Sequence, residues 1–289
     1  MGLKRMVFRG TNAFLRNLNL ELQVLSQDFD ARLDQPAQLN RIFSALGGVA
    51  DGWLERQRLF PVRSKFDSCK AVEKFYEAYV DSPFRTKQGG SRFNNLVWLH
   101  LIAKAMEPEL MIDSGTFHGA SAWAFALAGT PVYSFDIDLS RLAMRADGVV
   151  YSECDWTAFD WKGRNLTKAL VYFDDQLDQV RRLIEASERG IPVAIFDDDF
   201  PVTSFAAMAG DGHPLPKIEF VLDEQLRGAR ELSWIDHGRR LVFKVDPAYL
   251  DRARALIADT ERLADTSLVT GIQQTPYRIV KVAGVGIDA

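Results

Sequence analysis

The chain has 289 residues, of which 47% are hydrophobic and 26% charged, a composition typical of a globular protein with one elaborated domain. Its 35 Lys and Arg residues against 39 Asp and Glu residues give a formal net charge of −4, which argues against a general nucleic-acid-binding protein. No apolar run reaches the length of a membrane-spanning helix, no secretory pattern is present, and the two cysteines indicate neither a disulfide framework nor a zinc site. These features predict a cytoplasmic protein.

Residues 1–20 combine four basic residues with several apolar ones and contain no acidic residue. A basic amphipathic segment of this kind can lie on an anionic membrane surface, which would place the protein at the inner face of the membrane. The alternative is a terminal arm that packs on its own domain or on the partner subunit of a homo-oligomer.

Helices are predicted over 36–60 and 70–80, where apolar residues recur at near-helical spacing. A third helix is expected between Phe93 and Pro108, because its apolar residues share one face and proline ends it. The stretch 86–92 between them contains paired glycines and is expected to form a loop that can close over a site as a lid.

After Pro108 the pattern changes to short apolar runs separated by helical stretches, which is typical of a parallel sheet with crossover helices. Crossover helices are expected over 119–128, 139–146 and 176–189. The five predicted strands are Leu110–Ile112, Val132–Phe135, Val149–Tyr151, Leu170–Phe173 and Val193–Phe196.

Further strands are predicted over 218–222, 232–235 and 241–245, the last two joined as a hairpin. Asp246-Pro247 is a helix-start signal, and the helix is expected to run to Ala264 before a final strand over 277–282.

The complete pattern predicts a doubly wound, Rossmann-like α/β fold with a mostly parallel sheet and antiparallel final strands. It divides the chain into a helical N-terminal addition (1–85), the Rossmann-like domain (86–246) and a C-terminal helix and short strand that pack on it (247–289).

The segment from Leu110 to Ser121 has the pattern of a strand, a glycine turn and a helix start. Glycines let a ligand approach the backbone, and the N–H groups of a helix start favour an anionic group. The spacing of Gly115 and Gly119 fits neither the dinucleotide fingerprint nor a P-loop. Asp136 ends the next strand, where a carboxylate can accept hydrogen bonds from ribose hydroxyls.

These two segments resemble the first two motifs of class I S-adenosylmethionine (SAM)-dependent methyltransferases. The wording Gly-Thr-Phe-His-Gly-Ala-Ser at 115–121 is similar to the macrocin O-methyltransferase and cephalosporin-hydroxylase-like group, and the resemblance covers residues 86–246. It implies that SAM is the cofactor; the alternative is a glycine turn that binds no ligand. The cofactor-binding residues it implies are Asp113, Gly115, Gly119 and Ser121 for the methionine part, Asp136 for the ribose, and Asp155 and Trp156 for the adenine.

Two acidic clusters follow neighbouring strands: Asp174-Asp175 after the fourth and Asp197-Asp198-Asp199 after the fifth. In a parallel sheet both clusters emerge at the same edge, where the carboxylates repel one another unless protons or a cation compensate them. Carboxylate oxygens suit Mg²⁺ better than zinc. The alternative is that these residues only form turns and helix caps.

The resemblance supports the metal, because metal-dependent O-methyltransferases take one acid after the fourth strand and an acidic pair after the fifth. It assigns Asp174, Asp197 and Asp198 as Mg²⁺ ligands here, and leaves open whether the pair is 197/198 or 198/199. His213, in a glycine-containing loop after the fifth strand, and Asp175, beside the metal, are the two candidates for the general base.

The function that the resemblance implies is a SAM-dependent, Mg²⁺-assisted O-methyltransferase. The expected substrate is a small molecule, with a hydroxyl of a sugar or of a glycosylated compound as the acceptor. Two alternatives remain open: a hydroxylase-like enzyme on the same fold, and a non-catalytic cofactor-binding partner protein.

Overall fold

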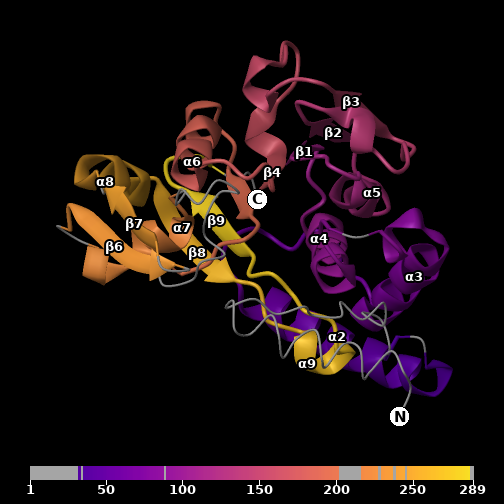
Figure 1. Cartoon of the computed structure of the whole chain (residues 1–289). Helices are drawn as coiled ribbons and strands as arrows, with labels where there is room; N and C mark the ends of the chain where they lie inside the picture. Colours follow the sequence, from indigo (N-terminus) through magenta and orange to yellow (C-terminus); the bar gives the residue numbers. More distant parts are fainter. Residues whose placement is uncertain are drawn as a thin grey trace.

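The computed structural model describes residues 32–33, 35–87, 89–201, 216–226, 229–236, 239–244 and 246–286. At its centre lies a seven-stranded sheet of order β3-β2-β1-β4-β5-β9-β8 (Figure 1). The strands from β1 to β5 pair in parallel, and β9 runs antiparallel between β5 and β8. The predicted doubly wound fold with antiparallel final strands is therefore confirmed. The strands are β1 (Leu110–Ser114), β2 (Val132–Phe135), β3 (Val149–Ser152), β4 (Ala169–Phe173), β5 (Val193–Phe196), β8 (Ile257–Arg262) and β9 (Arg278–Val282).

The central strands read as unbroken apolar runs because helices cover both faces of the sheet. Side chains alternate between the faces, so Met111 and Leu170 belong to one buried cluster while Ile112 and Val171 belong to the other. The first cluster packs against α2 (Pro36–Arg56), α3 (Ser68–Asp81), α4 (Phe93–Met106) and α5 (Ala120–Ala126). The second packs against α6 (Gln179–Glu188), α7 (Ile218–Leu222) and α8 (Pro247–Ala255).

Local sequence explains several of the helix boundaries. The Asp67 carboxylate accepts the backbone N–H of Lys70 at 3.0 Å and so caps the start of α3. Asp246 caps α8 in the same way, with Pro247 at the first helical position, as predicted. Helix α4 is buried on almost every side, which fits its position between α3 and α5.

Three predicted elements are wrong. Residues 139–146 form only the 3₁₀ turn η2 (Leu139–Arg141). Residues 218–222 form helix α7 instead of a strand, and the Asp199 carboxylate accepts the backbone N–H of Glu219 at 2.7 Å in its first turn. A five-residue apolar run has too little periodicity to distinguish the two states. The last long helix ends at Ala255, because the following residues pair as β8 with the otherwise open edge of β9.

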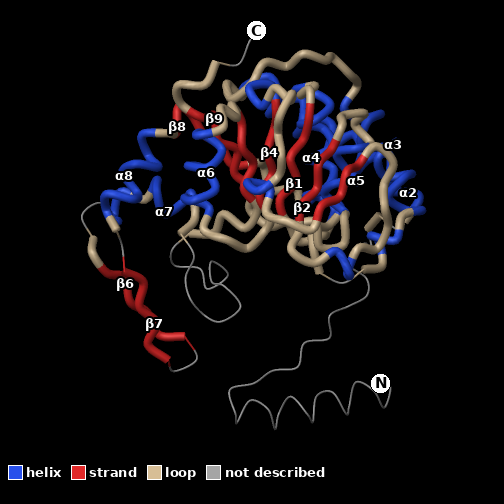
Figure 2. The backbone as a smooth tube through the Cα atoms, turned by 90° about the horizontal axis from the view of Figure 1, so that it is seen from above, coloured by secondary structure: helices blue, strands red, loops and turns tan. Residues whose placement is uncertain are grey.

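The predicted hairpin forms from β6 (Glu231–Asp236) and β7 (Arg239–Lys244), but it is a separate two-stranded sheet. Figure 2 shows it extending away from the seven-stranded sheet. The C-terminal segment contributes more than the predicted single strand, since both β8 and β9 belong to the central sheet. A short helix, α9 (Ser267–Thr270), lies between them in the chain.

Within the described residues, no helix is long and apolar enough to cross a membrane. Residues 1–20 lie outside the described part of the chain, so the expected contact with a membrane surface or a partner subunit stays a prediction.

Candidate active site

The turn after β1 requires glycine because it approaches the turn after β4. Gly115 has φ +107°, and a Cβ atom there would lie 2.4 Å from the backbone oxygen of Asp174. Gly119 also has a positive φ, of +87°, and a Cβ atom there would lie 2.7 Å from the Leu142 side chain. Both glycines of the motif are therefore fixed by backbone conformation and by close packing.

Asp113 lies below this turn and lines none of the cavities described below. Its side chain is fully buried: Ser134 Oγ donates to Oδ2 at 2.5 Å, while Oδ1 has no hydrogen-bond partner. Burial raises the pKa of Asp113 to about 7. Asp113 is therefore held by Ser134 of β2 and does not line the cavities.

Asp136 lies at the end of β2, facing the glycine turn. Its Oδ2 accepts the backbone N–H of Phe117 at 2.8 Å, and its Oδ1 accepts that of Asp138 at 3.2 Å. Phe117 has φ +44°, a left-handed conformation that aims its N–H at this carboxylate. Each oxygen keeps further acceptor capacity for a ligand hydroxyl.

A cavity of about 480 Å³ opens beside Asp136 at the carboxyl edge of the sheet. Its wall combines acidic side chains with apolar ones, including Phe135 and Leu177. Ile137 also lines it and is 87% exposed, so an apolar side chain faces the open cavity. An apolar wall beside a hydrogen-bonding carboxylate is the arrangement that a nucleoside requires.

The predicted adenine contacts are only partly at this cavity. Asp155 lines it, but its carboxylate is paired with Arg182, whose Nη2 lies 2.6 Å from Asp155 Oδ2. Hydrogen bonds and charge from Arg182 and Thr157 outweigh the effect of burial and lower the pKa of Asp155 to about 2. The Trp156 ring is fully buried under β4, against Phe173, so it does not line the cavity.

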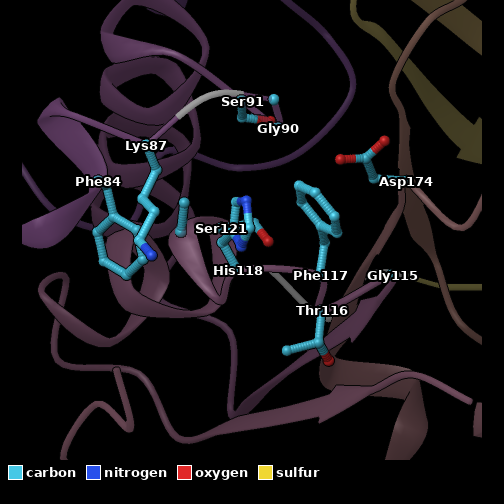
Figure 3. A pocket seen from close by; sticks show the side chains of 12 residues that line it. Phe84, Lys87, Gly90, Ser91, Gly115, Thr116, Phe117, His118, Ser121 and Asp174 are labelled. Carbon is cyan, nitrogen blue, oxygen red and sulfur yellow. The ribbon is translucent and has the colours of Figure 1, made fainter. Parts of the chain in front are cut away.

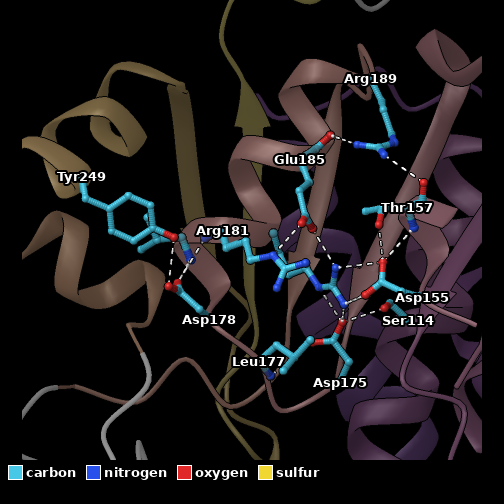
Figure 4. Close-up of polar contacts among 12 residues, drawn as sticks. Ser114, Asp155, Thr157, Asp175, Leu177, Asp178, Arg181, Glu185, Arg189 and Tyr249 are labelled. Atoms are coloured by element: carbon cyan, nitrogen blue, oxygen red, sulfur yellow. Dashed lines mark hydrogen bonds and ion pairs between the residues drawn. The ribbon is translucent and has the colours of Figure 1, made fainter. Parts of the chain in front are cut away.

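Arg182 is the centre of this charge cluster, whose carboxylates Asp155, Asp175 and Glu185 are labelled in Figure 4. It is 2% exposed, and besides Asp155 it pairs with Asp175 and with Glu185, each at 2.7 Å. Asp175 also accepts a hydrogen bond from Ser114 Oγ at 2.7 Å. Asp175 is therefore held by Arg182 and Ser114, and its role as the general base stays a prediction.

The second acidic cluster meets the first at a polar cavity of about 360 Å³, which Asp174, Asp197 and Asp198 all line. Burial, followed by the charges of Asp197 and Asp198, raises the pKa of Asp174 well above its ordinary value. Burial and the charge of Asp198 likewise raise the pKa of Asp197 to about 7, against hydrogen bonds that lower it. The three predicted metal ligands therefore lie at one cavity. Their negative charges repel one another unless protons or a cation compensate them.

Neighbouring residues hold these carboxylates in place. Tyr172 and Thr275 donate hydroxyl hydrogen bonds to Asp197 at 3.0 and 2.7 Å. The Gln176 amide donates to Asp198 at 3.1 Å and to Asp174 at 3.4 Å. Among the described residues, no group of three or more His, Cys, Asp or Glu is already gathered as a metal site.

Asp199 does not face the cavity that Asp197 and Asp198 line. It is fully buried and forms an ion pair with Arg278, which also binds Glu219. It lines none of the cavities described here, so Asp197 and Asp198 are the pair at the cavity. His213, the other candidate base, lies outside the described residues.

A third, narrow cavity lies between the loop before α4 and the glycine turn (Figure 3). Phe84, Lys87 and Gly89 line it from the loop side, and Thr116 and Ser121 from the turn and α5. Gly90 and Asp174 line all three cavities, so the three are adjacent and meet at these two residues.

Sequence reasoning missed several residues of this region. Arg182 had a local signal, because it lies between buried Val180 and Leu183 on the inner face of α6 and needs compensation there. Thr275 and Tyr277 had none: they come from the end of the chain and reach the site only because β9 pairs with β5.

No protein-family model matches the chain, and no curated protein sequence matches it. Among solved structures, the O-methyltransferase TomG of Streptomyces achromogenes, involved in tomaymycin synthesis and in complex with SAM, is 16% identical. The match covers 83% of this chain and 98% of TomG, with a TM-score of 0.42.

Two further matches have similar values. An O-methyltransferase of Bacillus cereus in complex with SAH is 12% identical over 83% of this chain and 99% of its own, with a TM-score of 0.39. CmcI with Mg and SAM is 14% identical over 71% of this chain and 84% of its own, with a TM-score of 0.38.

Proposed function

We propose that the chain is a SAM-dependent O-methyltransferase. The observation that carries the proposal is the meeting of three cavities at Gly90 and Asp174. One cavity has the features of a nucleoside site and another is bordered by carboxylates. A donor bound in the first would therefore lie next to an acceptor bound in the second, and such positioning accounts for much of the catalysis of a transfer reaction.

The larger cavity is proposed to bind the adenosine part of SAM. Asp136 accepts hydrogen bonds from the ribose hydroxyls, and Ile137 and Leu177 pack on the adenine. The glycine turn at Gly115 lets the rest of the cofactor pass close to the backbone, towards Asp174.

We call the part of the sheet edge where Asp174, Asp197 and Asp198 line the cavity of about 360 Å³ the acidic edge. These three carboxylates are proposed to hold Mg²⁺. The residues fit the ion, because all three supply oxygen donors, and the raised pKa values of Asp174 and Asp197 reflect burial and an uncompensated clustering of negative charge. When bound, Mg²⁺ lowers the pKa of a coordinated hydroxyl group. Tyr172 and Thr275 orient the Asp197 carboxylate through their hydrogen bonds.

The acceptor is proposed to be a hydroxyl group of a sugar or of a glycosylated small molecule. Besides its carboxylates and Arg92, the cavity at the acidic edge is lined by hydroxyl and amide side chains, and none of the described residues that line it is aromatic. Ser91, Asn95, Gln273 and Thr275 supply these groups. A lining of hydrogen-bonding groups favours a substrate with several hydroxyls over a flat aromatic one.

The test is methyl transfer from labelled SAM to a panel of sugars and glycosides, with and without EDTA. The wild-type protein is expected to methylate at least one of them only when Mg²⁺ is present. Asp198→Asn should reduce turnover at least about a hundredfold while leaving SAH affinity unchanged, since it removes one charged ligand of the metal. Asp147→Asn, at an exposed turn outside the cavities, is the control.

The outcomes separate the three readings of the sequence. Turnover that persists in EDTA contradicts the metal but not the transferase. SAH binding without transfer to any acceptor favours the non-catalytic partner, and consumption of the acceptor without methylation favours the hydroxylase-like enzyme.

A further inference from the structure

Lys87 is a cation at the narrow cavity with no assigned role. It lies in the loop before α4, and its side chain lines the cavity together with Phe84 and Ser121. Figure 3 shows the side chain extending from the loop towards the start of α5. Lys87 forms no ion pair with any residue that the structure describes. Its charge is therefore available to a ligand.

The other cations at the three cavities are placed differently. Arg182 lines the larger cavity, but its guanidinium is already paired with Asp155, Asp175 and Glu185. Arg92 lines the cavity at the acidic edge. Among the described residues, Lys87 is therefore the one Lys or Arg side chain that lines the narrow cavity.

The path of the cofactor brings an anion to this cavity. If the adenosine part lies beside Asp136, the remainder passes Gly115, which lines both the larger and the narrow cavity. The amino-acid end of the cofactor then enters the narrow cavity, and this end carries an α-carboxylate. A carboxylate that leaves water requires a cation or several hydrogen-bond donors.

We propose that the Lys87 ammonium binds the α-carboxylate of the amino-acid end of the cofactor. This inference rests on the proposed function. The pairing is a charge-assisted hydrogen bond, made by a flexible side chain that lines the cavity together with Phe84. Because Lys87 is exposed in the ligand-free protein, the pair forms only when ligand binds, and it joins the loop to the cofactor.

The test compares two ligands that differ at this end. S-adenosylhomocysteine carries the α-carboxylate, whereas 5′-methylthioadenosine keeps the adenosine and the sulfur but lacks the amino-acid part. Lys87→Met, which keeps the length of the side chain and removes its charge, should bind S-adenosylhomocysteine about tenfold more weakly. Its affinity for 5′-methylthioadenosine should equal that of the wild-type protein, as measured by calorimetry.

Two further variants serve as controls. Lys87→Arg keeps the charge and should retain most of the affinity for S-adenosylhomocysteine. Lys162→Met removes an exposed lysine that lines none of the cavities and should change neither affinity. The loss in Lys87→Met should shrink at high salt, because salt screens an exposed ion pair.

Each of the remaining outcomes contradicts either the proposed function or the assignment of Lys87. If the wild-type protein binds neither ligand, the proposed function fails. If it binds S-adenosylhomocysteine and Lys87→Met binds it equally well, the assignment of Lys87 is wrong. An equal loss for both ligands also overturns the assignment, because the residue then acts on the nucleoside or on the loop.

Discussion

At the scale of single residues, Asp136 has two roles in the proposed site. It accepts the backbone N–H of Phe117 and so shapes the glycine turn, and it faces the larger cavity. Asp136→Ala should weaken S-adenosylhomocysteine binding by about 1.5–3 kcal/mol, the range for a hydrogen bond to a charged group. Calorimetry on the folded variant measures this, with Asp147→Ala as the exposed control. Unchanged affinity would remove Asp136 from the ribose site.

Arg182 has a structural role that can be measured separately. Arg182→Met leaves Asp155, Asp175 and Glu185 without their shared cation and should lower the free energy of unfolding by about 3–5 kcal/mol at pH 7. The pKa of Asp155 is lowered to about 2, so its ion pair contributes stability above its unfolded pKa near 4 and loses it as the pH falls towards 2.

The difference between Arg182→Met and the wild-type protein should therefore become smaller over this acidic range. Urea unfolding at several pH values checks it. Arg252 on α8 forms an exposed ion pair with Glu188 on α6, and Arg252→Met should cost less than about 1 kcal/mol. A pH-independent difference for Arg182→Met would mean that lost packing, and not charge, causes the effect.

At the scale of elements, the turn between β1 and α5 is fixed by its contact with the turn after β4. Gly115→Ala and Gly129→Ala both place an alanine at positive φ, but only at Gly115 would the new Cβ meet backbone atoms. Gly129→Ala should cost about 1–2 kcal/mol, the strain of the left-handed region. Gly115→Ala should cost about 2 kcal/mol more, because the backbone must shift. Equal losses in chemical denaturation would contradict the close approach.

Helix α4 carries a buried histidine that makes stability depend on pH. His100 Nδ1 donates to the backbone oxygen of Ala124 on α5 at 3.2 Å, and burial lowers the pKa of His100 to about 4. The unfolded chain takes up this proton below about pH 6.5, so the contribution of His100 to stability falls as the pH falls from 6.5 to 4. The total loss is about 3 kcal/mol.

His100→Gln should remove this dependence while keeping a donor for Ala124. The measurement is the difference in unfolding free energy between wild type and variant from pH 7 to 4, which cancels the titration of the other groups. A constant difference over this range would show that His100 has the same pKa in the folded and the unfolded chain.

At the scale of the whole molecule, the C-terminal segment completes the central sheet. Tyr277, Ile279 and Val280 are fully buried, and β9 pairs with β5 beside the acidic edge. A chain ending at residue 246 should therefore lose cooperative unfolding, because it exposes β5 and part of both cores.

The matched control replaces 231–244 by a short Gly-Ser linker, since β6 and β7 form their own sheet. This deletion should keep the cooperative transition. Thermal unfolding followed by circular dichroism distinguishes the two chains, and a cooperative transition in the chain ending at 246 would make β8 and β9 dispensable.

Sequence reasoning succeeded where short-range patterns decide the structure. The five parallel strands and α4 are distinct apolar segments with clear ends, and both acidic clusters directly follow the ends of β4 and β5. It failed at β8, which forms because β9 has an open edge to pair with. It also failed at α7, because a single hydrophobic turn has too little periodicity to identify a helix. In the site, the burial of the Trp156 ring against Phe173 and the ion pair of Asp175 with Arg182 could not be predicted, because both depend on packing against other elements.

The contact between Gly115 and the Asp174 backbone also constrains how this protein can diversify. Backbone atoms form both sides of this contact, so no side chain is present there through which point mutations could adjust the spacing between the proposed cofactor site and the acidic edge. The opposite wall, with Gln273 and Thr275, consists of replaceable side chains on a surface segment. If the proposed function holds, changes of acceptor, in evolution or by directed mutagenesis, should therefore accumulate on that wall, while the distance between the two cavities stays constant.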